Sequence, residues 1–203
     1  MKIKLYLMFF ILASSAILGK IEVTKMILPT PQVINVTNNV FNLDIDLTIG
    51  ISDNSLEFHA EQIKSSLLNR FGIKSSIAQN GKINLNLVDK LDNIDVDEQL
   101  LNQAYTLVIT EDKIEINALN SKGLFYGTMS LVQLLDKAIT KELPTLEIVD
   151  WPNMEIRGIS DDISRGQVSN LKNFKRIIDF IARYKMNVYM PYLEDMIQLK
   201  SEL

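Results

Sequence analysis

Four ionisable residues lie close together in the stretch "EIRGISDDISRGQ", residues 155–167: Arg157, Asp161, Asp162 and Arg165. Arginine and aspartate side chains can hold a polar ligand through charge-assisted hydrogen bonds. They can equally pair with one another in an ion-pair network that only closes a surface turn. The residue types leave both interpretations open, so the decision depends on the elements that carry these side chains.

A strand, a helix and a second strand are predicted around this stretch. An apolar strand covers residues 154–160, a helix with an apolar stripe lies within residues 169–186 with Ser169 as its cap, and residues 187–191 form another apolar strand. A β-α-β unit of this length makes its two strands parallel neighbours. Arg157 is predicted inside the first strand, where an inward-pointing guanidinium needs an anionic or hydroxyl-rich partner.

The residues that follow two parallel strands lie on one side of the sheet, and α/β folds place their binding sites there. The polar residues at these positions are Asp161, Asp162, Arg165, Tyr192, Glu194 and Asp195. The sequence therefore predicts that two clusters of ionisable groups meet on one face.

The preceding part of the chain, residues 31–150, predicts an α+β domain in which two helices cover one face of a sheet. Residues 41–49 alternate as a single half-buried strand, and helical spacing covers residues 52–72 and 121–138. We expect His59 on the surface of the first helix and Ser121 as the cap of the second. Gly123 and Gly127, four positions apart, allow the second helix to lie close to the sheet.

The first nineteen residues have the layout of a signal peptide. Lys2 and Lys4 precede the apolar run from Leu5 to Leu12, and small residues follow it. The alternatives are an uncleaved anchor or a buried helix, but the run is short for a bilayer span. We expect export to a bacterial periplasm or beyond the cell, with no membrane association after cleavage.

Composition excludes several kinds of site. The net charge is −4 and no basic patch is evident, which argues against a nucleic-acid partner. The absence of cysteine excludes disulfides and thiolate sites, and His59 is the single histidine. We therefore expect neither a metal nor a cofactor.

The segment "WPNMEIRGISDDISRG", followed by a helix and "YKMNVYMPYLED", resembles the start of the catalytic barrel of glycoside hydrolase family 20, the β-N-acetylhexosaminidases. The matching positions are Arg157, Gly158, Asp162 and Arg165, with Tyr184 to Asn187 at the end of the helix. Upstream, "ILPTPQ", "AYTLVITEDKIEINA" and "GLFYGTMSLVQLL" are similar to the accessory domain of that family.

This resemblance implies a domain plan. Residues 1–19 are a signal peptide, residues 20–150 an α+β accessory domain, and residues 151–203 the start of an incomplete (β/α)8 TIM barrel. It implies that Arg157 contacts hydroxyl groups of a terminal N-acetylglucosamine or N-acetylgalactosamine. Asp162 and Arg165 are implied to organise the wall of that pocket, and Asp195 matches an aspartate after the second strand.

The resemblance also implies where catalysis occurs. A neighbouring Asp-Glu pair on a later barrel strand acts with the 2-acetamido group of the substrate in a retaining mechanism. We therefore expect no catalytic residue in this chain and no activity from it alone. Gly166-Gln167 and Met190-Pro191-Tyr192 depart from the family pattern. The alternatives are a family 84 N-acetylglucosaminidase, an α-glucuronidase, or a non-catalytic remnant that has lost its barrel.

Overall fold

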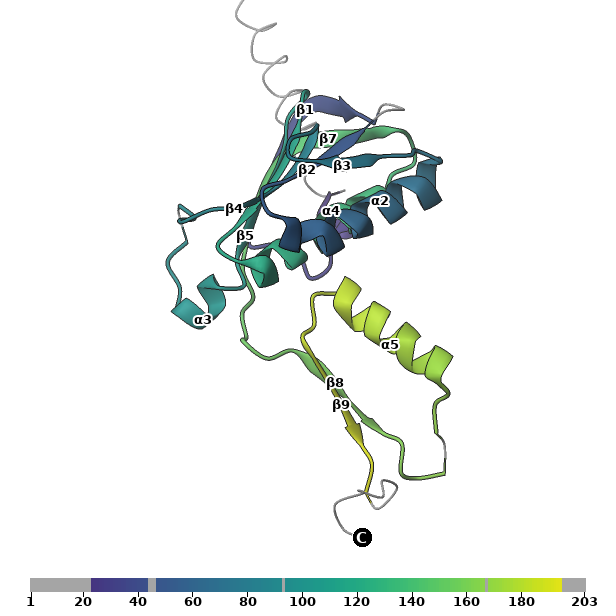
Figure 1. Cartoon of the computed structure of the whole chain (residues 1–203). Helices are drawn as coiled ribbons and strands as arrows, with labels where there is room; N and C mark the ends of the chain where they lie inside the picture. The colour runs from purple at the N-terminus through teal and green to yellow at the C-terminus, as the bar shows by residue number, and fades with distance from the viewer. Residues whose placement is uncertain (1–22, 44–46, 93, 167, 195–203) are drawn as a thin grey trace, which may run out of the picture. The chain divides into compact units, whose positions relative to one another are not determined.

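The computed structural model describes residues 23–43, 47–92, 94–166 and 168–194 (Figure 1). The chain divides into two compact units, Met1–Asn153 and Met154–Leu203, and each is described by itself. The signal peptide predicted at residues 1–19 lies outside the described residues. None of the helices in the described ranges is long and apolar enough to cross a bilayer.

The first unit is built on a mixed sheet, which has seven strands in the described part of the chain. In spatial order they are β1 (Val33–Asn42), β7 (Glu142–Asp150), β5 (Tyr105–Ile109), β6 (Ile114–Ala118), β4 (Ile83–Leu87), β2 (Thr48–Ile51) and β3 (Ser76–Ala78). From β1 to β6 the neighbours pair antiparallel, and from β6 to β3 they pair parallel.

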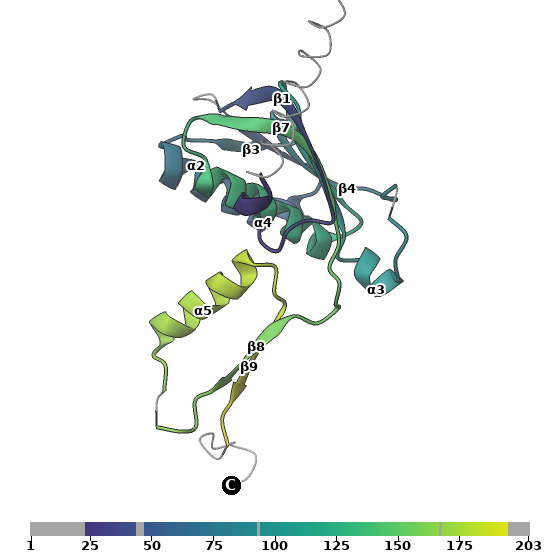
Figure 2. The ribbon, with the colours of Figure 1, turned by 180° about the vertical axis from the view of Figure 1, so that it is seen from behind.

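Two long helices cover one face of this sheet, as predicted. The helical segments between the strands are η1 (Asn54–Leu56), α2 (Glu57–Phe71), α3 (Glu98–Leu101) and α4 (Ser121–Lys137). Figures 1 and 2 show α2 and α4 side by side on the same side of the sheet, where they contact each other. The short helix α3 lies between β4 and β5 in the sequence.

The boundaries of α2 follow from local chemistry. The Asp53 carboxylate accepts a hydrogen bond from the Ser55 amide at 2.7 Å, which starts the helical segment. Gly72 ends it in the left-handed region, with φ of 69°. Between them the predicted apolar stripe is buried against the sheet, including Ile63 and Leu67.

Helix α4 lies unusually close to the sheet, and its two glycines are the reason. A Cβ atom on Gly123 would lie 2.3 Å from the Ala104 carbonyl oxygen. One on Gly127 would lie 2.5 Å from a methyl carbon of Ile116. The close packing predicted from the glycine spacing is therefore confirmed, but the cap is Asn120 rather than Ser121.

Two further predictions for the first unit are wrong. The alternating run at residues 41–49 is not one strand, because Phe41 belongs to β1 at one edge of the sheet and Ile49 belongs to β2 near the other. His59 is buried, with 4% of its surface exposed, because α2 packs beside α4. Its Nε2 lies 3.0 Å from the carbonyl oxygen of Ser121 in the first turn of α4.

A buried polar group joins α4 to the end of β7. The hydroxyl of Tyr105 donates to Asp150 Oδ2 at 2.8 Å and lies 2.6 Å from Ser130 Oγ. Burial, reinforced by the Asp150 carboxylate, raises the pKa of Tyr105 well above its ordinary value. This phenol therefore stays neutral and serves as a structural hydrogen-bonding group.

The second unit is the predicted β-α-β unit. It consists of β8 (Gly158–Asp162), α5 (Leu171–Arg183) and β9 (Val188–Tyr192), and the two strands pair in parallel with Gly158 opposite Val188. The predicted cap of α5, Ser169, is replaced by Asn170, whose side chain accepts from the Asn173 amide at 2.9 Å. Strand β8 starts later than predicted, so Arg157 precedes the strand instead of lying inside it.

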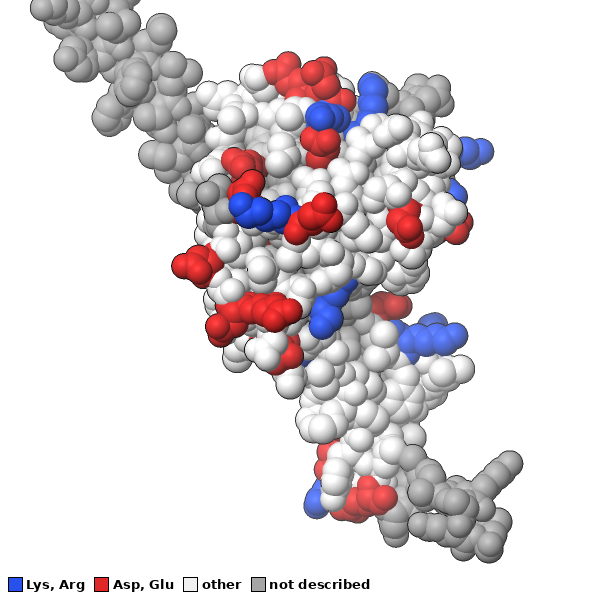
Figure 3. Space-filling model, turned by 60° about the vertical axis from the view of Figure 1, so that its left-hand side comes forward, with Lys and Arg blue, Asp and Glu red and all other residues white. Residues whose placement is uncertain are grey.

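Charged side chains are interspersed on the surface. On the face drawn in Figure 3, acidic and basic groups are both present, and the described residues there show no continuous basic area.

Candidate functional site

The carboxyl ends of β8 and β9 bring together polar side chains from both strands. The described members of this group, hereafter the strand-end cluster, are Asp161, Asp162, Ser164, Arg165, Tyr189, Tyr192 and Glu194. The connection is direct, because the Ile163 amide donates to the Tyr192 carbonyl at 3.2 Å just past the paired strands. The predicted meeting of two polar clusters is therefore confirmed for the described residues.

Arg165 lies at the centre of the exposed part of this cluster. Its Nε is 3.0 Å from Asp162 Oδ2, and its Nη2 is 3.8 Å from Glu194 Oε1. Three-quarters of the Arg165 side chain remains exposed. Exposed ion pairs add little stability, so the pair mainly orients a guanidinium that still has donors to offer.

Asp162 is fixed by the turn that follows β8. Its Oδ1 accepts hydrogen bonds from the Ser164 hydroxyl at 2.6 Å and from the Ser164 amide at 3.0 Å. These bonds, with a smaller contribution from Arg165, lower the pKa of Asp162. Asp162 is therefore an acceptor in the neutral pH range and is unsuited to act as a proton donor there.

Asp161 points toward the neighbouring strand. The Tyr189 hydroxyl donates to Asp161 Oδ2 at 2.7 Å, and the Tyr189 ring meets Phe174 of α5 edge-on with centroids 6.3 Å apart. Desolvation and the Asp161 carboxylate raise the pKa of Tyr189 to about 12. The contacts of Tyr189 with Asp161 and Phe174 link β8, β9 and α5. The sequence did not predict this role of Tyr189, because a tyrosine at an alternating position of a short strand carries no distinctive signal.

Arg157 lies at the opposite end of the two strands. Its guanidinium donates to the Lys185 carbonyl through Nε at 3.0 Å and Nη2 at 2.8 Å, and to the Met154 carbonyl through Nη1 at 2.6 Å. Because Arg157 precedes β8, it does not join Arg165 in the strand-end cluster. In (β/α) folds the amino ends of the strands are associated with stability and the carboxyl ends with function.

Asn187 completes the arrangement at the amino ends. Its Oδ1 accepts from the Arg157 amide at 2.8 Å, and its Nδ2 donates to the Glu155 carbonyl at 2.7 Å. Lys185 has φ of 60° in the left-handed turn that ends α5, a conformation that costs a non-glycine residue energy. Arg157 and Asn187 therefore fix the turn from α5 into β9, a role that their spacing in the sequence did not reveal.

Two other features were predicted for the site: a contribution from Asp195 and no bound metal. Asp195 lies outside the described residues. Within the described ranges, no group of three or more histidine, cysteine, aspartate or glutamate side chains is arranged to hold a metal ion. The strand-end cluster offers hydrogen-bond donors and acceptors, which suit recognition of a polar, hydroxyl-bearing ligand.

Comparison with known proteins shows which family this chain resembles. Residues 24–151 match the family model described as "Glycosyl hydrolase family 20, domain 2". The chain is 30% identical over 179 residues to a β-hexosaminidase of Vibrio vulnificus, which covers 88% of this chain and 20% of the relative.

Solved structures agree with this match. The chitobiase of Flavobacterium johnsoniae has a TM-score of 0.72 and 28% identity, covering 87% of this chain and 28% of that one. An exo-β-N-acetylglucosaminidase of Vibrio harveyi in complex with N-acetylglucosamine has a TM-score of 0.70 and 27% identity, covering 84% of this chain and 26% of that one. The chain thus spans about a quarter of the length of these solved proteins. It spans 20% of the length of the curated relative.

Proposed function

Because this chain belongs to glycosyl hydrolase family 20, we propose that it supplies the accessory domain and the first β-α-β unit of the catalytic barrel of an exported β-N-acetylhexosaminidase. The observation that carries the proposal is the extent of similarity. The family model ends at residue 151, whereas the Vibrio vulnificus relative aligns with 88% of the chain and so continues beyond the accessory domain.

The structure of the second unit supports its assignment to a (β/α)8 barrel. Parallel strands joined by a helix are the repeating unit of a (β/α)8 barrel, in which each strand has a neighbour on both edges. Apolar side chains of this unit are exposed, among them Ile156, Phe180 and Met190. Exposed apolar surface of this kind is usually buried by further structure, which later strands and helices of the barrel would supply.

The strand-end cluster is the proposed sugar site. Arg165, oriented by Asp162, is placed to donate hydrogen bonds to hydroxyl groups of a terminal N-acetylhexosamine. Asp195, after β9, is proposed to contribute an acceptor. Arg157, which the sequence led us to place in the sugar site, is proposed instead to position β8 and β9 from their amino ends.

The reaction proposed for the whole enzyme is hydrolysis with retention. A glutamic acid protonates the leaving glycosidic oxygen, and the 2-acetamido oxygen of the substrate attacks the anomeric carbon while an aspartate orients it. Water then opens the cyclic intermediate and restores the acetamido group. We propose that this Asp-Glu pair lies on a barrel strand after β9, because the acids of the strand-end cluster are held as acceptors.

The proposal is tested by comparing two proteins in one assay. The 203-residue chain and the product of the coding sequence that continues past codon 203 are purified and incubated with an aryl β-N-acetylglucosaminide. We expect turnover from the longer product only, and Arg165→Lys in it should raise KM more than it lowers kcat. Turnover by the 203-residue chain would contradict the proposal, as would a coding sequence that stops there.

A further inference from the structure

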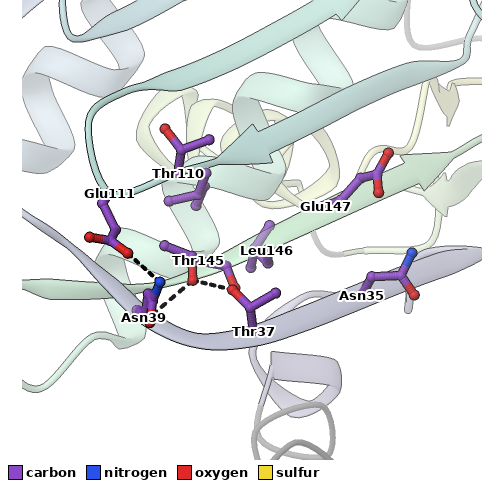
Figure 4. Close-up of a pocket in the computed structure, with 9 residues that line it drawn as sticks. Asn35, Thr37, Asn39, Thr110, Glu111, Thr145, Leu146 and Glu147 are labelled. Atoms are coloured by element: carbon purple, nitrogen blue, oxygen red, sulfur yellow. Dashed lines mark hydrogen bonds between the residues drawn. The ribbon is translucent and has the colours of Figure 1, made fainter.

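A groove lined by several polar side chains lies on the first unit. Its volume is about 320 Å³, and residues of β1, β7 and the turn between β5 and β6 line it. Figure 4 shows these side chains from three separate segments around one opening. A volume of this size lies at the lower end of small-ligand sites, about 300–1,000 Å³.

An irregularity in β1 shapes the groove. Val36 pairs with Leu146 and Val40 pairs with Pro144, so residues 37–39 of β1 stand opposite Thr145 alone. Such a bulge re-aims side chains and interrupts pairing, and bulges are common beside binding sites. Here it directs Thr37 and Asn39 into the groove (Figure 4).

One wall of the groove is fixed by hydrogen bonds. The Thr145 hydroxyl donates to the Asn39 carbonyl at 2.9 Å and also contacts the Thr37 hydroxyl. The Asn39 side-chain amide donates to the Glu111 carboxylate of the β5–β6 turn. Thr145 is only 5% exposed, so this wall belongs to the folded framework and is not a chance arrangement of surface side chains.

The other wall carries an exposed pair of polar side chains. Asn35 and Glu147 lie directly opposite each other on β1 and β7, and both are exposed. Among the described residues, no side-chain hydrogen bond or ion pair is recorded for either one. An amide and a carboxylate therefore line this part of the groove, with donors and acceptors exposed to solvent.

The chemistry of the lining selects the ligand. The lining contains amides, hydroxyls and two carboxylates, Glu111 and Glu147, together with apolar surface that includes Ile109 and Leu146, but no lysine or arginine. Carboxylates disfavour an anionic ligand and accept strongly from hydroxyl groups, while the asparagine amides donate to carbonyl and ring oxygens. This complement fits a neutral, polyhydroxylated ligand that also carries an amide.

We propose that this groove binds one unit of a β-linked N-acetylglucosamine chain as a non-catalytic sugar site. The choice of sugar rests on the proposed function, whereas the groove and its polarity do not. Such a site would hold a polymeric ligand through the accessory domain independently of the strand-end cluster.

The test is a titration of the full chain with a β-1,4-linked N-acetylglucosamine trimer, monitored by ¹H–¹⁵N NMR spectra. We expect saturable shifts at Asn35, Thr37, Glu111 and Glu147, with a glucose trimer of the same linkage binding more weakly. The paired substitutions Asn35→Ala and Glu147→Ala should weaken binding about fivefold or more, since each removes a hydrogen bond to the sugar.

The same two strands supply a matched control. Asn42 and Glu142 are also opposite each other on β1 and β7, but they lie outside the groove. Asn42→Ala with Glu142→Ala should leave the titration unchanged. Equal weakening by both pairs, or no shift in the groove at saturating trimer, would overturn the inference. Shifts confined to residues 158–165 would overturn it while leaving the proposed function intact.

Discussion

Two arginines eight positions apart have different surroundings. Arg165 follows β8 and is three-quarters exposed beside Asp162 and Glu194. Arg157 precedes β8, and its guanidinium binds backbone carbonyls that include the one at Lys185. The difference arises because a strand carries the chain from one end of the sheet to the other between them. We infer that one arginine faces ligand and the other sets the geometry of the strands.

Substitution of Arg157 should therefore destabilise the second unit. Arg157→Ala should lower the opening free energy of β8 and β9 by about 2 kcal/mol, since charge-assisted hydrogen bonds to several carbonyls are lost. Arg157→Lys should recover only part of this lost free energy, because the lysine ammonium keeps a charged donor but lacks the planar fork of a guanidinium. Native-state hydrogen exchange of the β8 and β9 amides measures the effect. Arg165→Ala is the control, and an equal loss of protection there would contradict the assignment.

Buried His59 should make the first unit sensitive to acid. Burial lowers its pKa from the ordinary value of 6.5, so the unfolded chain binds a proton more readily than the folded one. The stability linked to His59 is complete above about pH 6.5 and is lost as the pH falls through the lowered value. We expect Tm to decline between about pH 7 and pH 5. His59→Gln should flatten that decline, and an unchanged slope would refute this origin.

Residue types predicted the strand-end cluster but not its internal contacts. The positions of Asp162 and Arg165 after an apolar strand were enough to place them on one face. The helix caps were each displaced by one residue, since serine and asparagine are both good caps and only geometry selects between neighbours. The role of Asn187 could not be predicted, because it depends on carbonyl groups that converge only in the folded unit.

At the scale of elements, hydrophobic periodicity predicted α2, α4, α5 and the pairing of β8 with β9. It failed at residues 41–49, where one alternating pattern continues from β1 into β2. Alternation reports which side of a strand is buried and contains no information on where the chain leaves one position in a sheet for another. The parallel pairing of β2 with β3 follows from the crossover through α2, which connects these two strands.

The contact between α4 and the sheet gives a prediction at this scale. Gly127→Ala should destabilise the first unit by about 2 kcal/mol, because its Cβ would overlap Ile116 and Tyr105. Thermal unfolding monitored by circular dichroism measures this. Lys122→Ala, at an exposed position of the same helix, should stay within about 0.5 kcal/mol of the parent. If Gly127→Ala were equally neutral, α4 would not be held as closely as the structure indicates.

At the scale of the whole molecule, the chain combines a first unit that has a large hydrophobic core with a second unit that has few buried hydrophobic residues. Residues buried in the first unit form one hydrophobic cluster, whereas in the described part of the second unit the buried hydrophobic residues are Ile163 and Ile181. The first unit therefore has what an independently stable domain needs, and we propose that the second is covered by further strands and helices of the barrel. This contrast is what the proposed barrel explains.

The most direct test of this account is the hydrolysis of an aryl β-N-acetylglucosaminide by the product of the coding sequence that continues past codon 203, measured beside the 203-residue chain. The account predicts turnover by the longer product, none by the shorter chain, and a higher KM after Arg165→Lys in the longer one. Turnover by the shorter chain, or an inactive longer product that is correctly folded, would contradict it.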